Sequence, residues 1–543
     1  MIEAKFWKEL EMQFTQNLEK KAPWIGTAVI LFLVLLLGTF LRLQFINKSS
    51  FPMNDGGFFY TAIRDLQQNG FHLPKYTTYN FLNIPYAYPP LSLYAAAWIN
   101  QFLKVDLLTI FLYFPLIFNL ISIPAFYFLS KELVENQRSA LLATAFYAIL
   151  NPGYEWLISG GGLTRSPAHT YFIISLTLFL VFLRTSKKWI FILSIIAGAL
   201  VTLHHLEYTW VLAYSVIIFT FFSRRTLKSF VHIAVFGLGI GVLTSPYWIT
   251  ILKYHGLSPF LSAFSTGETN FIKSFIRIVL LDFTSEPFTT FINVLAVVGI
   301  FIGVIKKKYA LLAWFSAIIF LGFRSAYRLL LFPVAVFAAF SLDSLIIPGF
   351  NQIEQRIREA TRMPFSRPPL SGKLFAILSI FLPFLLGFVS SLSDHPVLSS
   401  VNPEELQAME WVKVNTDSDS SFLIINSSTD WSVDRLGEWF PSIAERHSET
   451  TVQGKEWLPD NEFMRERWFY SNFKECISEG GVPCLTSWAE KIGSTFTHLF
   501  VSKAECAWNS SNCTDYFILT VEDSNAFTKI YENEEVVIYR LKK

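Results

Sequence analysis

Long apolar runs separated by short polar segments dominate the first 392 residues of the chain. A run of roughly 17–25 apolar residues can cross the hydrocarbon of a bilayer as an α-helix, because a helix satisfies its backbone hydrogen bonds internally. The pattern therefore predicts eleven membrane-spanning helices, at about residues 24–46, 107–130, 139–157, 168–183, 188–204, 207–222, 229–251, 288–305, 309–323, 327–347 and 374–392.

Basic residues between these runs predict the orientation of the chain. If the helices alternate in direction, one side receives Lys20/Lys21, Lys131/Arg138, Arg184/Lys187/Lys188, Arg224/Arg225/Lys228, Lys306–Lys308 and the run Arg356–Lys373. The positive-inside rule makes that side cytoplasmic. We therefore expect a multi-pass protein of the cell (plasma) membrane, with its N-terminus in the cytoplasm and its C-terminus outside.

Two segments are predicted to lie on the membrane surface. Tyr88–Leu103 must rest against the outer face, because a crossing there would place the Lys306–Lys308 run outside. The first 22 residues mix charged and apolar residues without a short apolar core and a cleavage site, so they do not resemble a signal peptide. An interfacial cytoplasmic helix is expected there instead.

The composition changes after residue 392, where a polar region begins. Residues 393–543 contain the helical stretch Pro403–Asn415 and four strand-like runs, Ser421–Asn426, His498–Ser502, Tyr516–Thr520 and Glu535–Arg540. The predicted fold class is thus a polytopic α-helical membrane domain over residues 1–392, followed by an extracytoplasmic α/β domain over residues 393–543.

All the cysteines of the chain lie in this polar region, at Cys476, Cys484, Cys506 and Cys513. Disulfides form in oxidising compartments, and the spacing lacks the paired C-x-x-C of a zinc site. Short loops favour the pairs Cys476–Cys484 and Cys506–Cys513. A metal site and inert thiols are the alternatives.

Overall composition excludes a single soluble domain. Of 543 residues, 52% are hydrophobic and only 16% are charged, which is too apolar for one soluble core. The net charge is +2 and the basic residues are scattered rather than gathered in one patch, so no nucleic-acid partner is indicated.

Charged residues of both signs collect at the predicted outer ends of the helices. Asp55, in Met53-Asn54-Asp55-Gly56-Gly57, begins the first outer loop, and the later loops contribute Glu155, Thr164, Arg165, His204, His205, Glu207, Arg324 and Arg328. Charges near a membrane are costly unless they are paired, hydrated or used. Together they suggest a site for a lipid phosphate and a reacting hydroxyl group.

Each of these residues also has a structural interpretation. Asp55 precedes a helical stretch and could be its N-cap. His204, His205 and Glu207 could bind a metal, contact a substrate or cap a helix. Arg324 and Arg328 are one helical turn apart and could be snorkelling residues. Arg165 follows three glycines, whose backbone could approach an anion closely or form a flexible loop.

Several of these features together resemble the GT-C glycosyltransferase superfamily. They are the first apolar span, the outer-loop acid in Asn54-Asp55-Gly56-Gly57-Phe58-Phe59-Tyr60, the helix Ala62–Gly70, the segment Tyr88-Pro89-Pro90-Leu91-Ser92-Leu93-Tyr94 and the extracytoplasmic α/β domain. This superfamily includes protein O-mannosyltransferases, the aminoarabinose transferase that acts on lipid A and the catalytic subunit of oligosaccharyltransferase.

The resemblance implies a membrane glycosyltransferase with a polyprenyl-phosphate sugar donor and a protein, lipid or glycan acceptor. In such enzymes the first-loop acid is the general base or orients the acceptor, a role that falls to Asp55 here. From position alone, Arg165, Arg324, Arg328, His204 and His205 are the candidates for binding the donor phosphate. A divalent ion, Mg²⁺ or Mn²⁺, would need Glu155 or Glu207 as its second carboxylate, because Asp55 has no acidic neighbour.

The oligosaccharyltransferase signature Trp-Trp-Asp-x-Gly is absent, which argues against an Asn-glycosylating enzyme. The nearest segments that combine aromatic and acidic residues are Thr429-Asp430-Trp431 and Gly437-Glu438-Trp439-Phe440-Pro441. A transporter of lipid-linked sugars would show inverted repeats and mid-membrane charges, which the chain lacks. A non-catalytic assembly or binding subunit remains an alternative. Glycosylation sequons occur at Asn47, Asn426, Asn509 and Asn512.

Overall fold

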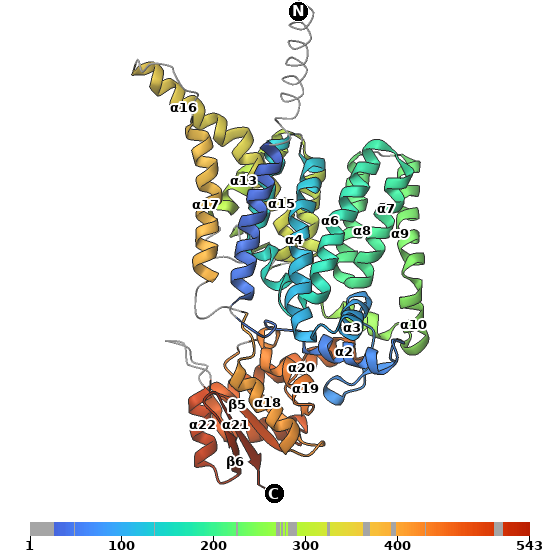
Figure 1. The fold of residues 1–543 in the computed structure, drawn as a ribbon, viewed down its shortest axis with the longest axis vertical. Helices are drawn as coiled ribbons and strands as arrows, with labels where there is room; N and C mark the ends of the chain where they lie inside the picture. The colour runs from blue at the N-terminus through green and yellow to red at the C-terminus, as the bar shows by residue number, and fades with distance from the viewer. Residues whose placement is uncertain are drawn as a thin grey trace, which may run out of the picture.

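Long helices form one half of the molecule and an α/β region forms the other (Figure 1). This computed structural model describes residues 26–47, 49–134, 136–223, 226–267, 272, 275–276, 279–280, 290–322, 326–361, 370–391, 398–428, 430–503 and 514–542. The short helices α2, α3 and α10 lie between the two halves (Figure 1).

The helical half is built from the predicted apolar runs. Its helices are Gly26–Ile46, α4 (Leu107–Leu133), α5 (Gln137–Ile149), α6 (Gly162–Thr185), α7 (Lys188–His204), α8 (Leu206–Ser223), α9 (Leu227–Leu243), α10 (Ser245–His255), α11 (Ser258–Ser265), α13 (Thr290–Ile305), α14 (Tyr309–Leu321), α15 (Ala326–Ser341), α16 (Ile347–Ala360) and α17 (Ser371–Ser391). Within the described ranges, six helices are long and apolar enough to cross a membrane, or seven if the bent pair α9 and α10 counts as one. The number eleven therefore stays a prediction.

Proline and glycine explain where two predicted helices were wrong. The run at 139–157 is helical only to Ile149, and two short 3₁₀ turns, Asn151–Gly153 and Glu155–Leu157, follow it. Pro152 and Gly153 disfavour further helix there. The run at 229–251 is divided at Thr244, with a bend of 65° between α9 and α10. Pro246 lacks the N–H that a continuous helix would need at this point.

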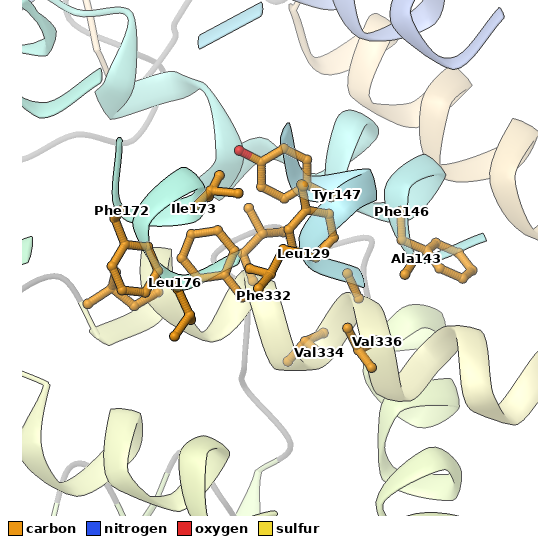
Figure 2. Packing of buried hydrophobic residues seen from close by; sticks show 14 of the residues in the cluster. Leu129, Ala143, Phe146, Tyr147, Phe172, Ile173, Leu176, Phe332, Val334 and Val336 are labelled. Carbon is orange, nitrogen blue, oxygen red and sulfur yellow. The ribbon is translucent and has the colours of Figure 1, made fainter. Parts of the chain in front are cut away.

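The core of the helical half lies where α4, α5, α6 and α15 meet (Figure 2). Phe332 of α15 packs against Phe172 of α6 and Tyr147 of α5, with ring centroids 5.4 and 6.0 Å apart. The buried His169 has polar partners here, because its two ring nitrogens lie 2.7 and 3.1 Å from the hydroxyls of Tyr147 and Tyr208. Both ring nitrogens of His169 are therefore satisfied by tyrosine hydroxyls within this core.

The first predicted outer loop folds into α2 (Gly57–Gln68), a 3₁₀ turn (Tyr79–Phe81), the two-stranded ribbon β1 (Tyr76–Thr77) and β2 (Ile84–Pro85), and α3 (Leu91–Leu103). Asp65 of α2 fixes the ribbon, because its carboxylate accepts hydrogen bonds from both threonine hydroxyls at 77 and 78 (2.6 Å each). One face of α3 is buried, while Trp98 and Phe102 are exposed. This agrees with a helix that rests on a surface.

The C-terminal region holds a five-stranded sheet with the order β4-β3-β5-β7-β6. Its strands are β3 (Ser421–Ile425), β4 (His447–Ser448), β5 (His498–Ser502), β6 (Phe527–Glu532) and β7 (Val536–Leu541). Strand β3 is parallel to β4 and β5, whereas β7 is antiparallel to β5 and β6. Its helices are α18 (Pro403–Asn415), α19 (Arg435–Ile443), α20 (Glu462–Glu475), α21 (Gly481–Ile492) and α22 (Thr514–Asp523).

The predicted strand Tyr516–Thr520 is wrong, because these residues belong to helix α22. Phe517 and Val521 are both buried, which is the spacing of one helical face rather than of a strand. A short apolar run cannot distinguish the two structures by itself. The edge strand β6, which follows α22, was missed.

The sheet connects to the helical half through one of its faces. Along β3, Phe422 and Ile424 point to one side and Leu423 and Ile425 to the other, as alternation in a strand requires. The cluster that contains Phe422 continues through Phe440 of α19 to Phe58 of α2. The C-terminal region and the first predicted outer loop thus share one hydrophobic core.

The disulfide Cys476–Cys484 is present, as predicted. Cys506 and Cys513 lie outside the described residues, so their pairing stays a prediction. We expect mass spectrometry of unreduced peptides to find both bridges, since each closes a short loop. Free thiols at 506 and 513 would contradict the second bridge and leave the first intact.

The orientation predicted from the basic clusters can be tested by cysteine labelling. Lys75 is exposed on the first predicted outer loop, and Gln355 is exposed on α16 at the other end of the helical half. An impermeant thiol reagent added to intact cells should label a Lys75→Cys protein, and should label a Gln355→Cys protein only after permeabilisation. The reverse result would invert the topology.

Candidate active site

A cavity of about 720 Å³ lies where the helical half meets the C-terminal region. Its wall on the helical side includes Asp55, Arg165, His205, Glu207 and Arg328, all of which the sequence had singled out. The wall on the C-terminal side includes Asp430, Trp431, Glu438, Glu456 and Trp457. Aromatic side chains and charges of both signs therefore surround one space.

Asp55 lies in a turn with an unusual backbone. Asn54 has φ = 55° and Gly56 has φ = 134°, both in the region that L-residues other than glycine avoid. The N-cap of α2 is Gly56 and not Asp55. The capping interpretation of Asp55 is therefore wrong, and its carboxylate points instead toward the loop that holds Ser159 and Gly161.

Three donors hold the Asp55 carboxylate, which is only 6% exposed. Oδ1 accepts hydrogen bonds from the Ser159 hydroxyl and from the Gly161 backbone N–H, both at 2.9 Å. Oδ2 forms an ion pair with Arg165. Two carboxylate oxygens offer about four acceptor positions, so one position on Oδ2 is left for a ligand.

The glycine triplet 160–162 allows this close approach. Gly160 N–H donates to the Met53 carbonyl at 2.8 Å. A Cβ on Gly160 would overlap the Asp55 carbonyl, and one on Gly161 would overlap both Arg165 Nη2 and Asp55 Oδ2. These glycines are packed against the Asp55 turn and do not form the open, flexible loop that the sequence also permitted.

Two arginines flank the indole of Trp156 beside the pocket. The guanidinium carbons of Arg165 and Arg328 lie 5.6 and 6.0 Å from the centroid of this ring. Arg165 also donates to the Trp156 carbonyl at 2.9 Å, so its head group is fixed in direction. Arg328 is 8% exposed and lines the pocket. Arg324 lies outside the described residues.

The adjacent residues His204 and His205 lie in different surroundings. His204 ends α7, where its Nδ1 lies 2.6 Å from the Ser92 hydroxyl and its ring stacks on Tyr171. It does not line the pocket, whereas His205 does. The two therefore cannot act as a pair on one ligand, and only His205 keeps its proposed contact with the donor.

The candidate metal ligands do not form a metal site. In the part of the chain that the structure describes, no three His, Cys, Asp or Glu side chains are grouped to hold an ion. Glu207 lines the pocket, but Glu155 does not, and Asn151 donates to Glu155 instead. The partners of Asp55 are all hydrogen-bond donors, which suit a carboxylate and not a cation. No step is therefore assigned to a metal.

The sequence had assigned no site role to three carboxylates that line the pocket, Asp430, Glu438 and Glu456. Glu438, in the segment Gly437-Glu438-Trp439-Phe440-Pro441, lines the pocket and accepts a hydrogen bond from Gly56 N–H at 2.7 Å. Burial raises the pKa of Glu438 to about 7, and the hydrogen bond from Gly56 opposes this shift. The only local signal was the combination of acidic and aromatic residues, because Gly56, the residue that Glu438 contacts, lies 382 positions away in sequence.

The fold buries the asparagine of one predicted sequon. Asn426 is 4% exposed, and its side-chain amide donates to Asp434 at 2.7 Å. It cannot accept a glycan in the folded protein.

No family model matches the chain, and no curated protein sequence is similar to it. Solved structures do resemble it. The archaeal oligosaccharyltransferase AglB from Archaeoglobus fulgidus is 14% identical and aligns with a TM-score of 0.56 over 95% of this chain and 74% of that one. The arabinofuranosyltransferase AftD from Mycobacteria is 12% identical, with a TM-score of 0.54 over 95% of this chain and 40% of that one.

ArnT from Cupriavidus metallidurans in the apo state is 12% identical, with a TM-score of 0.51 over 95% of this chain and 98% of that one. All three are membrane glycosyltransferases of the GT-C superfamily. At these low identities the likeness concerns the arrangement of the chain in space. The chain has the GT-C fold that the sequence had suggested.

Proposed function

We propose that this protein is an integral-membrane glycosyltransferase that moves a sugar from a polyprenyl-phosphate donor to an extracytoplasmic acceptor. The observation that carries the proposal is the Asp55 carboxylate, held by three donors in a pocket that Arg165 and Arg328 also line. The GT-C fold supports it, because the neighbours with this fold transfer sugars from lipid-linked donors.

The proposed reaction uses Asp55 as the general base. The acceptor hydroxyl oxygen forms a bond to the anomeric carbon of the sugar, and the bond between that carbon and the phosphate oxygen breaks. The hydroxyl proton passes to Asp55 Oδ2, and the polyprenyl phosphate leaves with the bonding electrons. A carboxylate in hydrogen-bond reach of the hydroxyl can assist this step.

Arg328 and Arg165 are placed to offset the charge that develops on the leaving phosphate. Guanidinium groups bind phosphate oxygens through charge-assisted hydrogen bonds, and fixed charges act strongly in a site with little water. AglB has been solved with a dolichol-phosphate and an inhibitory peptide. By analogy, the donor phosphate is proposed to lie against the helical wall of this pocket.

The opposite wall is proposed to receive the acceptor. It carries the carboxylates of Asp430 and Glu456 and the guanidinium group of Arg467. An acidic wall repels a phosphate and accepts hydrogen bonds from hydroxyl groups. The two substrates would then approach Asp55 from opposite sides.

The direct test is transfer from radiolabelled polyprenyl-phosphate sugars to a membrane extract from the native host. The purified protein in lipid should transfer label from at least one donor to an acceptor in the extract. Inactivity with every donor would favour the non-catalytic alternative.

Replacing Arg328 should affect donor binding before it affects turnover. In Arg328→Ala, the apparent KM for the donor should rise by about tenfold or more while kcat changes less, because the lost contact is made in the ground state as well. Arg184→Ala is the matched control. Arg184 lies in the last turn of α6, at the opposite end of this helix from Arg165, and pairs with Glu132 at 2.9 Å. An unchanged KM in Arg328→Ala would remove Arg328 from the donor site.

A further inference from the structure

The Asp55 turn is held from two sides, and one of these is the C-terminal region. The second outer loop supports one side through Gly160 and Gly161. The middle of α19 supports the other side. Trp439 Nε1–H donates to the Asn54 carbonyl at 2.9 Å, and Glu438 Oε1 accepts from Gly56 N–H at 2.7 Å.

The contacts from α19 meet the turn where its backbone is least favourable. A residue other than glycine at positive φ, such as Asn54 at φ = 55°, persists only when its surroundings hold it there, since this conformation costs free energy. Gly56, at φ = 134°, has its N–H bonded to Glu438. The Trp439 ring occupies the space beside it, since a Cβ on Gly56 would lie 2.9 Å from Trp439 Cζ2.

Further bonds extend this contact on both sides of the turn. Asn54 Nδ2 donates to the Ser432 carbonyl at 2.9 Å, and the Ser442 hydroxyl donates to the Gly57 carbonyl at 2.6 Å. Tyr79 donates its hydroxyl to the Glu438 carbonyl at 2.7 Å, which fixes the backbone of Glu438 itself. The ring of Trp439 is fully buried. The contact is therefore a packed interface with defined partners.

We propose that Glu438, together with Trp439, is a positioning residue that holds the Asp55 turn in its reactive geometry, so that the C-terminal domain forms part of the catalytic site. This inference rests on the proposed function, because it assigns a role in the reaction of Asp55. Glu438 acts through Gly56 and takes no proton from the substrate. Its raised pKa fits this role, because a carboxyl that is partly protonated near neutral pH still offers a carbonyl oxygen to Gly56.

Two substitutions at Glu438 separate positioning from charge. Glu438→Gln keeps a carbonyl oxygen that can accept from Gly56 N–H, so kcat should stay within about threefold of wild type. Glu438→Ala removes the acceptor and leaves the buried N–H unsatisfied. Because a shift of about 1 Å in a reacting group can cost roughly 10²-fold, kcat should fall by one to two orders of magnitude in this variant. The KM for the donor should change less than kcat, since Arg328 is untouched.

A second measurement does not depend on activity. Hydrogen exchange of the peptide around Gly56, followed by mass spectrometry in lipid nanodiscs, should be faster in Glu438→Ala and unchanged in Glu438→Gln. Trp439→Phe removes the donor to Asn54 and should give an intermediate increase. Glu410→Ala, at an exposed position on α18, is the control and should match wild type in both assays.

The outcomes distinguish this inference from the proposed function. If no donor supports transfer but Glu438→Ala still speeds exchange at Gly56 while Glu438→Gln does not, the function fails and the positioning contact stands. If Glu438→Gln loses transfer as completely as Glu438→Ala, the charge of Glu438 matters and positioning is wrong. Wild-type exchange and wild-type kcat in Glu438→Ala would overturn the inference as well.

Discussion

Asp55→Asn should lower glycosyl transfer by a factor on the order of 10² or more, the usual scale for the loss of a positioned general base. The asparagine carbonyl oxygen can still accept from Ser159 and Gly161, as Asp55 Oδ1 does. The amide nitrogen would then face Arg165, where the carboxylate now forms an ion pair. The variant keeps most of its local contacts but has neither the base nor the charge.

The measurement is transfer of labelled sugar by matched amounts of protein that has inserted into the membrane. Asp106→Asn is the control, because Asp106 caps α4 by accepting from Thr109 N–H at 3.1 Å, and asparagine caps helices equally well. This control should transfer sugar at the wild-type rate. Transfer at that rate by the Asp55→Asn protein would remove Asp55 as the base.

The hydropathy of each apolar run, taken by itself, predicted most helices of the helical half. Helix α7 begins and ends where the hydropathy pattern placed it, and α4 begins at the expected residue. Predictions failed where a single residue overrides the pattern, as at Pro152 and Pro246, or where a short apolar run fits two structures, as in α22. Local sequence thus predicts that an element exists more reliably than where it stops.

The candidate site required contacts that no local pattern contains. Asp55 could be singled out because a carboxylate beside a predicted membrane span is costly. Its ion pair with Arg165, and the contact of the neighbouring Gly56 with Glu438, depend on the packing of two loops and the C-terminal region. The same packing decides that His205 faces the pocket and His204 does not.

Substitution of Gly161 tests that packing most directly, because it removes no functional group. Its backbone lies in the ordinary right-handed helical region, at φ = −69° and ψ = −9°, so alanine adds no backbone strain. The added methyl group would instead overlap Arg165 Nη2 and Asp55 Oδ2 and force the pair apart. We expect Gly161→Ala to reduce kcat by a factor on the order of 10², since a displacement of about 1 Å is sufficient for such a loss.

Gly237→Ala is the matched control for this variant. Gly237 lies inside helix α9, and a Cβ there would meet no atom within 4 Å. Alanine in a helix interior is more stable than glycine by about 0.5–1 kcal/mol, so this variant should insert, fold and transfer sugar as well as wild type. If Gly161→Ala keeps wild-type kcat under the same assay, the close pairing of Asp55 with Arg165 is not the reactive arrangement, and the base must be sought elsewhere in the pocket. A selective loss in Gly161→Ala, with normal thermal stability, would show that transfer depends on the spacing of these two side chains.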